Sequence, residues 1–317
     1  MGGPAPFQLG GHEVPPGQRR RVEIPVARLP MGADMALSVD VLHGVREGPA
    51  LWLSGAIHGD ELDGIEIIHE VLDDLPPRAL AGTVVAVPIV NLYGAMNESR
   101  YLPDRRDLNR SFPGTARGSL AGQLAHLFMR EIVGRCGYGI DYHCGSDDRD
   151  NLPQVRGDLA DDETRRLALA FAAPVTVPGK PPEGSLRRAA VKVGARVILY
   201  EGGEARRFTR AAIGAGVRGT WRVMAALGMT APADEDEPEP TVEARTTQWL
   251  RAVRSGICRT EIELGQKVQK NQLVATIRDP LSSRSKQVRA RSAGIVIGRR
   301  INPLVYRGEA VAHVAVT

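Results

Sequence analysis

One stretch limits more than any other what this chain can fold into: an apolar run at residues 50–53 leads into the octapeptide SGAIHGDE at residues 54–61. Beyond it, apolar side chains recur with the period of an α-helix, at Ile65, Ile67, Ile68, Val71 and Leu72. A short apolar run is typical of a buried strand, and a period near 3.6 is typical of a helix with one buried face. The sequence therefore predicts that His58 and Glu61 lie on the turn between a buried strand and a helix.

This turn carries two side chains of the kinds that bind metal ions. An imidazole and a carboxylate three residues apart on a turn can converge on one cation, and a catalytic zinc ion takes three protein ligands and one water or substrate. The best candidate for the third ligand is His143, which ends a short apolar segment at residues 139–142. The alternative is that His58 only completes the hydrogen bonding of the turn, while Glu61 favours the positive end of the helix.

Length and composition indicate a globular protein of two domains. The chain has 317 residues, of which 43% are hydrophobic and 25% charged, enough for a sizeable core. Its net charge is only +4 and its aromatic content 4%, with no basic block interleaved with aromatic residues, which argues against nucleic acid binding. No apolar run is long enough to span a bilayer, and residues 1–16 carry Gly and Pro where a signal peptide needs an apolar core. Neither a membrane protein nor a secreted one is expected.

The cysteines indicate that the protein resides in a reducing compartment. Three of them, Cys136, Cys144 and Cys258, are widely spaced and odd in number. Such a set is not typical of a disulfide framework, so we expect a reduced, cytoplasmic protein.

The elements around the first turn predict an α/β fold. Residues 51–53 are the strand before the turn, and the helix after it runs to about Leu75, where two prolines follow. Residues 83–87 are β-branched and apolar, as in a buried strand. Strand, helix and strand in this order form a βαβ unit, which predicts a mostly parallel or mixed sheet with helices on both faces.

The same patterns place the other elements of this region. An N-terminal β-hairpin is expected from residues 22–26 and 35–42, which alternate apolar and polar side chains on either side of a turn. Further helices are expected at 120–133, 161–171, 185–193 and 208–227, a strand at 196–200, and long polar loops at 91–114 and 151–158.

A change in amino-acid composition near residue 231 predicts a domain boundary. Residues 231–240 form a Pro-rich acidic linker, which separates a domain at 1–230 from one at 241–317. The second domain shows only short β segments with turn signals between them, so a small all-β domain is expected. Its segments are 249–253, 256–260, 273–277, 287–290, 294–297 and 310–316.

Three candidate site residues share one kind of position. His58, His143 and Glu201 each follow a predicted apolar strand. Because sites in open α/β sheets gather at the carboxyl ends of the strands, we expect these three side chains to meet. Taken singly, Glu201 is more typical of a solvated carboxylate at a strand end than of a general base.

The polar loop at residues 91–114 has the composition of a binding loop. Its Arg and Asn side chains are donors that together can hold a carboxylate, since arginine offers a planar fork of N–H groups. The alternative is a solvated loop with surface ion pairs.

Five motifs, taken together, resemble a known family. They are His58-Gly59-Asp60-Glu61, Arg100, residues 107–114 (DLNRSFPG), Asp141-Tyr142-His143 and Glu201-Gly202-Gly203. In order and spacing they are similar to the succinylglutamate desuccinylase/aspartoacylase family, a branch of the zinc carboxypeptidase-like hydrolases, over about residues 45–230. Residues 264–268 and 292–296 of the C-terminal domain resemble a biotinyl/lipoyl-type barrel-sandwich hybrid, although no lysine stands in a recognisable attachment turn.

The resemblance implies a zinc carboxypeptidase-like mixed β-sheet flanked by helices, followed by a small all-β domain similar to a barrel-sandwich hybrid. It also implies one Zn²⁺ per chain, bound by His58, Glu61 and His143. Asp141 or Asp60 is then expected to orient a ligating histidine, or else to cap a local turn.

The resemblance implies roles for the remaining motif residues. Glu201 is the general base and acid, with Glu204 as the alternative, and Asn109 with Arg110 binds a carboxylate of the substrate. Arg100 lies near the scissile carbonyl, and Arg105 or Arg106 competes for that role because the segment before residue 107 is longer than usual.

The expected function is that of a zinc-dependent hydrolase of amide bonds, not of the peptidase type. It would be a deacylase that cleaves a small N-acyl amino acid or a related small carboxylate. Two alternatives stay open, namely a metallocarboxypeptidase acting on short peptides and a non-catalytic protein that binds a metal or ligand. The acyl group, the amine and whether the chain forms a homo-oligomer also stay open.

Overall fold

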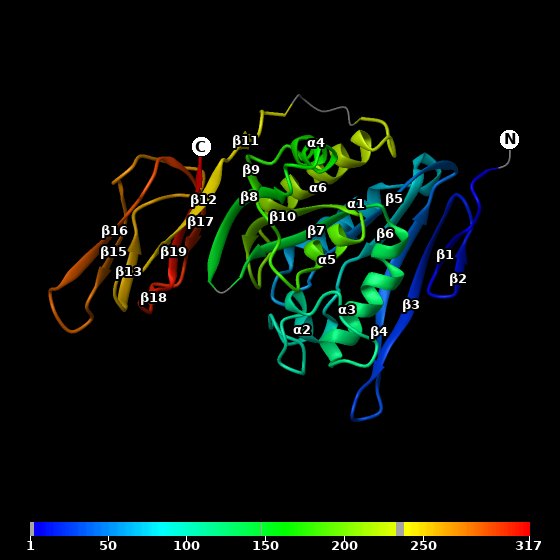
Figure 1. The fold of residues 1–317 in the computed structure, drawn as a ribbon, viewed down its shortest axis with the longest axis horizontal. Helices are drawn as coiled ribbons and strands as arrows, with labels where there is room; N and C mark the ends of the chain where they lie inside the picture. The colour runs from blue at the N-terminus through cyan, green and yellow to red at the C-terminus, as the bar shows by residue number, and fades with distance from the viewer. Residues whose placement is uncertain (1–2, 147, 233–237) are drawn as a thin grey trace.

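The computed structural model describes residues 3–146, 148–232 and 238–317 and shows a mixed α/β fold (Figure 1). Its helices are α1 (Asp63–Asp74), α2 (Leu92–Met96), α3 (Leu120–Glu131), α4 (Asp162–Phe171), α5 (Leu186–Lys192) and α6 (Arg210–Ala226). Its first ten strands are β1 (Phe7–Leu9), β2 (His12–Val14), β3 (Gln18–Arg28), β4 (Asp34–His43), β5 (Arg46–Ser54), β6 (Ala81–Val87), β7 (Tyr138–Gly145), β8 (Arg149–Gly157), β9 (Val175–Pro178) and β10 (Arg196–Glu204). The C-terminal strands are β11 (Val242–Glu243), β12 (Thr246–Arg251), β13 (Gly256–Thr260), β14 (Lys267–Val268), β15 (Leu273–Arg278), β16 (Ser285–Arg289), β17 (Gly294–Arg300), β18 (Leu304–Val305) and β19 (Ala310–Val316).

The large sheet confirms the predicted βαβ unit. Strands β5 and β6 pair in parallel, and α1 connects them. Strand β7 pairs in parallel with β5, and β10 pairs in parallel with β7, so these four strands form the parallel centre of the sheet. The predicted N-terminal hairpin is β3 and β4, which pair antiparallel and join the sheet through β6. The carboxyl ends of β5, β7 and β10 therefore lie next to one another.

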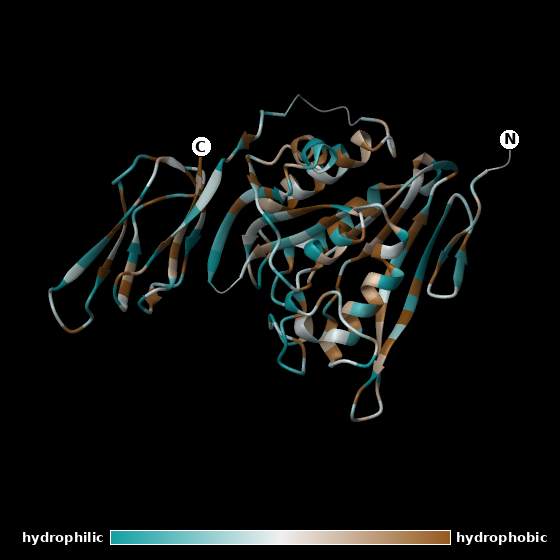
Figure 2. Ribbon diagram, viewed as in Figure 1, coloured by the Kyte–Doolittle hydropathy of each residue, from teal (hydrophilic) through white to brown (hydrophobic). Residues whose placement is uncertain are grey.

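Helices cover both faces of this sheet, as predicted. One hydrophobic core joins the sheet to α1, α4 and α6, and includes Ile67, Phe171 and Val223. The other joins it to α3 and α5, and includes Phe128 and Leu186. Figure 2 shows the hydrophobic colour concentrated on the central strands between these layers. Because both faces are buried, every residue of β6 is buried, as the apolar, β-branched run at 83–87 predicted.

The C-terminal strands are attached directly to the large sheet. Strand β17 pairs antiparallel with β8, which places Gly298 opposite Asn151, and β19 and β12 follow it. A second sheet of β16, β15, β13 and β18 packs against these strands around a separate core. The predicted short β segments are thus confirmed, whereas the predicted linker at 231–240 falls partly on residues 233–237, outside the described residues.

Two predictions about loops were wrong. Residues 151–158 were expected to form a polar loop, but most of them belong to strand β8. The strand forms because β10 pairs with it on one side and β17 and β9 on the other, and these distant partners leave no mark on the local sequence. The loop at 91–114 also contains helix α2 and a 3₁₀ turn at Leu108–Arg110.

Within the described ranges, none of the helices has the length and apolar content needed to cross a membrane.

Candidate active site

The predicted turn after β5 carries the first two candidate ligands. His58 and Glu61 are both buried, and α1 begins two residues after Glu61. The turn lies so close to α2 that a Cβ atom on Gly59 would stand 1.9 Å from the carbonyl carbon of Gly94. Only glycine fits at position 59, so the HGDE motif has a packing reason as well as a chemical one.

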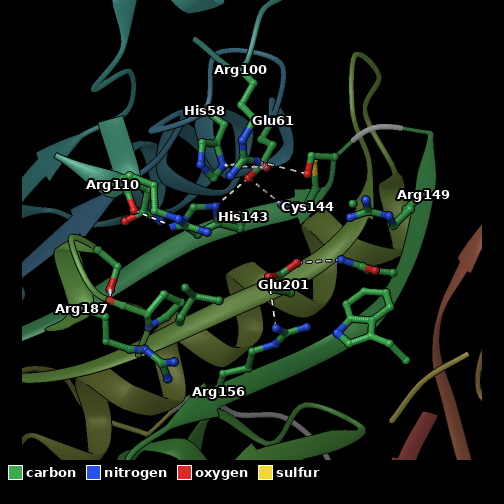
Figure 3. A pocket seen from close by; sticks show the side chains of 18 residues that line it. His58, Glu61, Arg100, Arg110, His143, Cys144, Arg149, Arg156, Arg187 and Glu201 are labelled. Carbon is green, nitrogen blue, oxygen red and sulfur yellow. Dashed lines mark hydrogen bonds and ion pairs between the residues drawn. The ribbon is translucent and has the colours of Figure 1, made fainter. Parts of the chain in front are cut away.

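The structure brings three predicted ligands together. The Nδ1 atom of His58 lies 2.8 Å from one carboxylate oxygen of Glu61, and the Nδ1 atom of His143 lies 2.7 Å from the other. One ligand atom from each of the three residues lies within 4.8 Å of the other two (Figure 3). Two imidazoles and a carboxylate form the donor set of several catalytic zinc sites, so this cluster could hold a metal ion.

The other nitrogens of the two imidazoles also face carboxylates. His58 Nε2 lies 3.3 Å from Asp107, and His143 Nε2 lies 3.0 Å from Asp141, which accepts a hydrogen bond from Ser54. A ligating histidine usually donates its second N–H to a carboxylate, which fixes the ring and makes the free nitrogen more basic. Both rings thus present Nδ1 towards Glu61 as a metal site requires. Of the two predicted orienting residues, Asp141 makes such a contact, and Asp107 was not predicted for it.

The charges of the cluster also suit a cation. Burial alone would raise the pKa of Glu61, but His58 and His143 lower it far below its ordinary value, so its carboxylate stays ionised. Burial would lower the pKa of His143, but Asp141 and Glu61 raise it well above its ordinary value. A cation that binds here would therefore displace protons, because ligating imidazoles are neutral.

The three candidate ligands line a cavity. Of the three arginines that were candidates for the scissile carbonyl, Arg100 lines this cavity with them. It donates two hydrogen bonds to Asp107, and its Nη1 atom lies 3.3 Å from His58 Nδ1 and 3.7 Å from Glu61. Arg105 and Arg106 are exposed and do not line this cavity.

Asn109 and Arg110 line the same cavity from the 3₁₀ turn. The side-chain oxygen of Asn109 accepts a hydrogen bond from the backbone N–H of Leu186, which leaves its amide N–H groups as donors. Arg110 donates to the carbonyl oxygen of Asn109, and no described carboxylate pairs with it. Both side chains can therefore donate to an anionic group in the cavity.

Glu201 stands beside His143 in the sheet. The two residues pair in register on the parallel strands β10 and β7, so their side chains project from the same face. Glu201 lies within β10 rather than after it, because the strand continues to Glu204. Its carboxylate accepts a 2.7 Å hydrogen bond from Asn151 and lies 3.8 Å from Arg156 (Figure 3). Glu204 pairs with Arg207 and does not line the cavity.

Sequence reasoning missed several residues of this cavity. Arg187 on α5 is 6% exposed, and its Nε and Nη1 atoms have no hydrogen-bond partner within the described structure. Burial, with Arg156 nearby, lowers the pKa of Arg187 to about 10. An arginine is seldom buried without a partner, so Arg187 marks a place where an anionic group would be stabilised. In the sequence it looked like any basic residue of an amphipathic helix.

The C-terminal strands contribute one wall of the cavity. Trp249 on β12 lines it together with Arg149 and Asn151 of β8, and the cavity has a volume of about 190 Å³. The indole of Trp249 stacks on His313 of β19, with ring centres 3.8 Å apart, and the guanidinium of Arg149 lies 5.6 Å from the indole centre. No motif in the sequence predicted this contact, because it depends on how β12 and β19 pair.

We expect His313 to make folding stability depend on pH. Burial, with Arg156 and Arg149 nearby, lowers the pKa of His313 to about 3, whereas an unfolded histidine has a pKa of about 6.5. Between these pH values the unfolded chain binds a proton at His313 that the folded chain does not. The contribution of His313 to the free energy of unfolding therefore falls by about 1.4 kcal/mol per pH unit as the pH falls from 6.5 towards 3. His313→Phe keeps a flat ring on Trp249 and removes the titration. Denaturant unfolding at pH 7 and pH 5 should therefore give a smaller loss of stability for the variant, and equal losses would contradict the expectation.

The comparisons with known proteins agree with one another. Residues 47–227 match the model of the succinylglutamate desuccinylase/aspartoacylase catalytic domain. The N-alpha-acetyl-L-2,4-diaminobutyric acid deacetylase of Halomonas elongata is 28% identical over 282 residues, which cover 85% of this chain and 82% of that protein.

Two solved structures are similar along nearly the whole chain. A succinylglutamate desuccinylase/aspartoacylase from Rhodobacter sphaeroides has a TM-score of 0.85 and 25% identity, and covers 93% of this chain and 94% of its own. The product-bound ectoine utilization protein EutE (DoeB) from Ruegeria pomeroyi also has a TM-score of 0.85 and 25% identity, and covers 94% of this chain and 95% of its own. The family match spans more than half of the sequence and includes every residue that lines the cavity except Trp249. The chain belongs to the succinylglutamate desuccinylase/aspartoacylase family.

Proposed function

We propose that the protein is a zinc-dependent amide hydrolase that removes the acyl group from a small N-acyl amino acid or a related small carboxylate. The observation that carries this proposal is the buried cluster of His58, Glu61 and His143 with Glu201 beside it on the neighbouring strand. One zinc ion per chain would be held by the two Nδ1 atoms and the carboxylate of Glu61. A zinc ion in such a site lowers the pKa of water to about 7 and polarises a carbonyl group.

The side chains around the cluster supply the rest of the chemistry. Glu201 takes a proton from the attacking water and passes it to the departing amine nitrogen, and Asn151 holds the carboxylate in place for this transfer. Arg100 presents its Nη1 group towards the cluster and stabilises the negative charge that develops on the carbonyl oxygen. Asp107 and Asp141 hold the two imidazoles in orientation.

Arginine and asparagine side chains define the substrate class. Asn109 and Arg110 would bind the carboxylate of the amino acid, which fixes the scissile amide relative to Glu201. The cavity of about 190 Å³ is smaller than the roughly 300–1,000 Å³ of sites for drug-sized ligands, which supports a small substrate over a peptide. The deacetylase from Halomonas elongata is named for such a substrate, N-acetylated diaminobutyric acid.

The proposal extends to the organisation of the chain. Residues 1–230 would form the catalytic domain, 231–240 a linker, and 241–317 a small β domain similar to a barrel-sandwich hybrid. The separate hydrophobic core of the C-terminal strands supports this division. A cytoplasmic location is in keeping with three buried cysteines that form no disulfide.

A substrate panel tests the proposal. Amine release is measured with zinc-loaded protein from N-acetyl, N-succinyl and other N-acyl amino acids and from short peptides. Turnover of one or a few N-acyl amino acids, and not of peptides, is the expected result. Turnover of peptides would instead assign the protein to the carboxypeptidases, and no turnover despite bound zinc would favour a binding protein.

Loss of Asn151 should slow the chemical step more than it weakens substrate binding. Its amide donates to Glu201 over 2.7 Å, and a Cβ atom on Gly298 of β17 would lie 2.9 Å from its side-chain oxygen, so the amide is tightly enclosed. A hydrogen bond to a charged group is worth about 1.5–3 kcal/mol, so Asn151→Ala should lower kcat about tenfold or more with little change in KM. The matched control is Asn97→Ala, an exposed asparagine. A change in KM alone would show that Asn151 acts on binding rather than through Glu201.

A further inference from the structure

A second hollow, larger than the catalytic cavity, lies where the C-terminal strands meet the catalytic part. Its volume is about 750 Å³. Its polar lining is dominated by five arginines, namely Arg149, Arg206, Arg251, Arg300 and Arg307. Ligand sites occur preferentially at junctions of this kind. Which ligand the hollow can bind depends on the side chains that line it.

The hollow carries an excess of positive charge. Asp148 and Glu309 are its acidic residues, and each has a partner already: Asp148 accepts a hydrogen bond from Asn302, and Glu309 lies 3.4 Å from Arg300. The other four arginines form no ion pair with a described carboxylate. Arg251 and Arg206 donate to backbone carbonyl groups, of Gly308 and Glu98.

Arg149 is the most enclosed of these unpaired arginines. Its guanidinium lies over the indole of Trp249, and its Nε atom is buried with no hydrogen-bond partner in the described part of the chain. A partly buried guanidinium without an ion-pair partner costs free energy, and an anion beside it in the hollow would offset that cost. The hollow is therefore better suited to bind an anion than an ordinary solvated surface is.

Strand pairing and side-chain hydrogen bonds hold the walls of the hollow in place. Strands β8 and β17 pair through backbone hydrogen bonds, and the N–H of Ile301 donates to the carbonyl oxygen of Asp148 over 2.8 Å. Asn302 binds the side chain of the same aspartate over 2.9 Å. These contacts fix the backbone on either side of Arg149 and Arg300, so the wall that carries these two arginines is preformed, which lowers the entropy cost of binding.

We propose that this hollow is an anion-binding site for a small molecule that carries two or more carboxylate or phosphate groups. Arginine suits this class because its planar fork of N–H donors matches the oxygens of both groups. One anionic group would lie at Arg149, and others at Arg251 and Arg307 across the hollow. This site lies outside the set of proposed metal ligands, and the proposal does not depend on the proposed catalytic function.

The anion in the hollow can come from either of two sources, the far end of the substrate or a separate molecule. Both spaces are lined by Arg149 and Trp249, so a ligand in one touches a wall of the other. If the anion is the far end of the substrate, it competes with substrate and its loss raises KM. If it is a separate molecule, it binds together with substrate.

Calorimetric titration of the full-length zinc-loaded protein with propane-1,2,3-tricarboxylate tests the proposal. The double variant Arg251→Gln/Arg307→Gln removes two exposed arginines of the hollow and should weaken binding about tenfold or more. The matched control, Arg284→Gln/Arg291→Gln, removes two exposed arginines of the same domain that do not line the hollow, and should change the affinity less than about twofold. Butyrate, with a single carboxylate, should bind far more weakly than the tricarboxylate.

Three results would overturn the site. They are no binding of the tricarboxylate to the wild-type protein, equal weakening in the two double variants, and equal affinity for butyrate. The titration is repeated with a saturating substrate analogue to distinguish the two sources. Since hydrolysis is not the readout, failure of this proposal is separable from failure of the proposed catalytic function.

Discussion

Replacing Glu201 by glutamine should reduce hydrolysis by about 10²–10⁴-fold and leave the bound metal in place. The amide keeps the size of the carboxylate but cannot accept the proton of the attacking water. His58, Glu61 and His143 are untouched by this change, and within the described structure none of them forms a hydrogen bond or ion pair with the Glu201 side chain. Kinetics with the best substrate of the panel, together with metal analysis of the purified variant, measure both effects.

Glu204 provides the matched control for this experiment. It lies three residues further along β10, pairs with Arg207 over 3.2 Å and does not line the cavity. Glu204→Gln should therefore keep nearly the wild-type rate. A nearly full rate in Glu201→Gln would refute the assignment of the base, and a large loss in Glu204→Gln alone would transfer the role to Glu204.

The second large effect is expected from the metal cluster. His143→Ala removes one of the three proposed ligands and leaves the carboxylates of Glu61 and Asp141 without the imidazole that lies between them. Metal content should fall from one ion per chain to nearly none. Turnover should fall by roughly 10³-fold or more, because the metal supplies several kcal/mol of stabilisation to the transition state.

Two controls separate loss of the metal from loss of the fold. His69→Ala removes an exposed histidine of α1 and should change neither metal content nor rate. Wild-type protein treated with a chelator should lose activity, and added zinc should restore it. Full activity of metal-free wild-type protein would refute the metal-dependent mechanism.

Local patterns in the sequence were sufficient for the central part of the fold. The apolar run before residue 54 and the helical period after residue 61 placed His58 and Glu61 on the turn between β5 and α1. The same reasoning located His143 and Glu201 near the ends of β7 and β10. Because parallel strands end at one edge of a sheet, it also predicted that these side chains meet there.

Tertiary contacts determined the rest of the site. Arg100 rather than Arg105 or Arg106 reaches the cluster, because Asp107 anchors its guanidinium beside His58. Asn151 lies on a strand that exists only because β10 and β17 pair with it.

The remaining walls of the cavity depend on distant pairing in the same way. Trp249 and Arg187 reach it from elements that are far apart in the sequence. Hydrophobic periodicity reports which face of an element is buried, but it does not report which other element covers that face. The sequence by itself therefore determined the candidate ligands and the turn that carries two of them, whereas the pairing of distant strands determined what surrounds them.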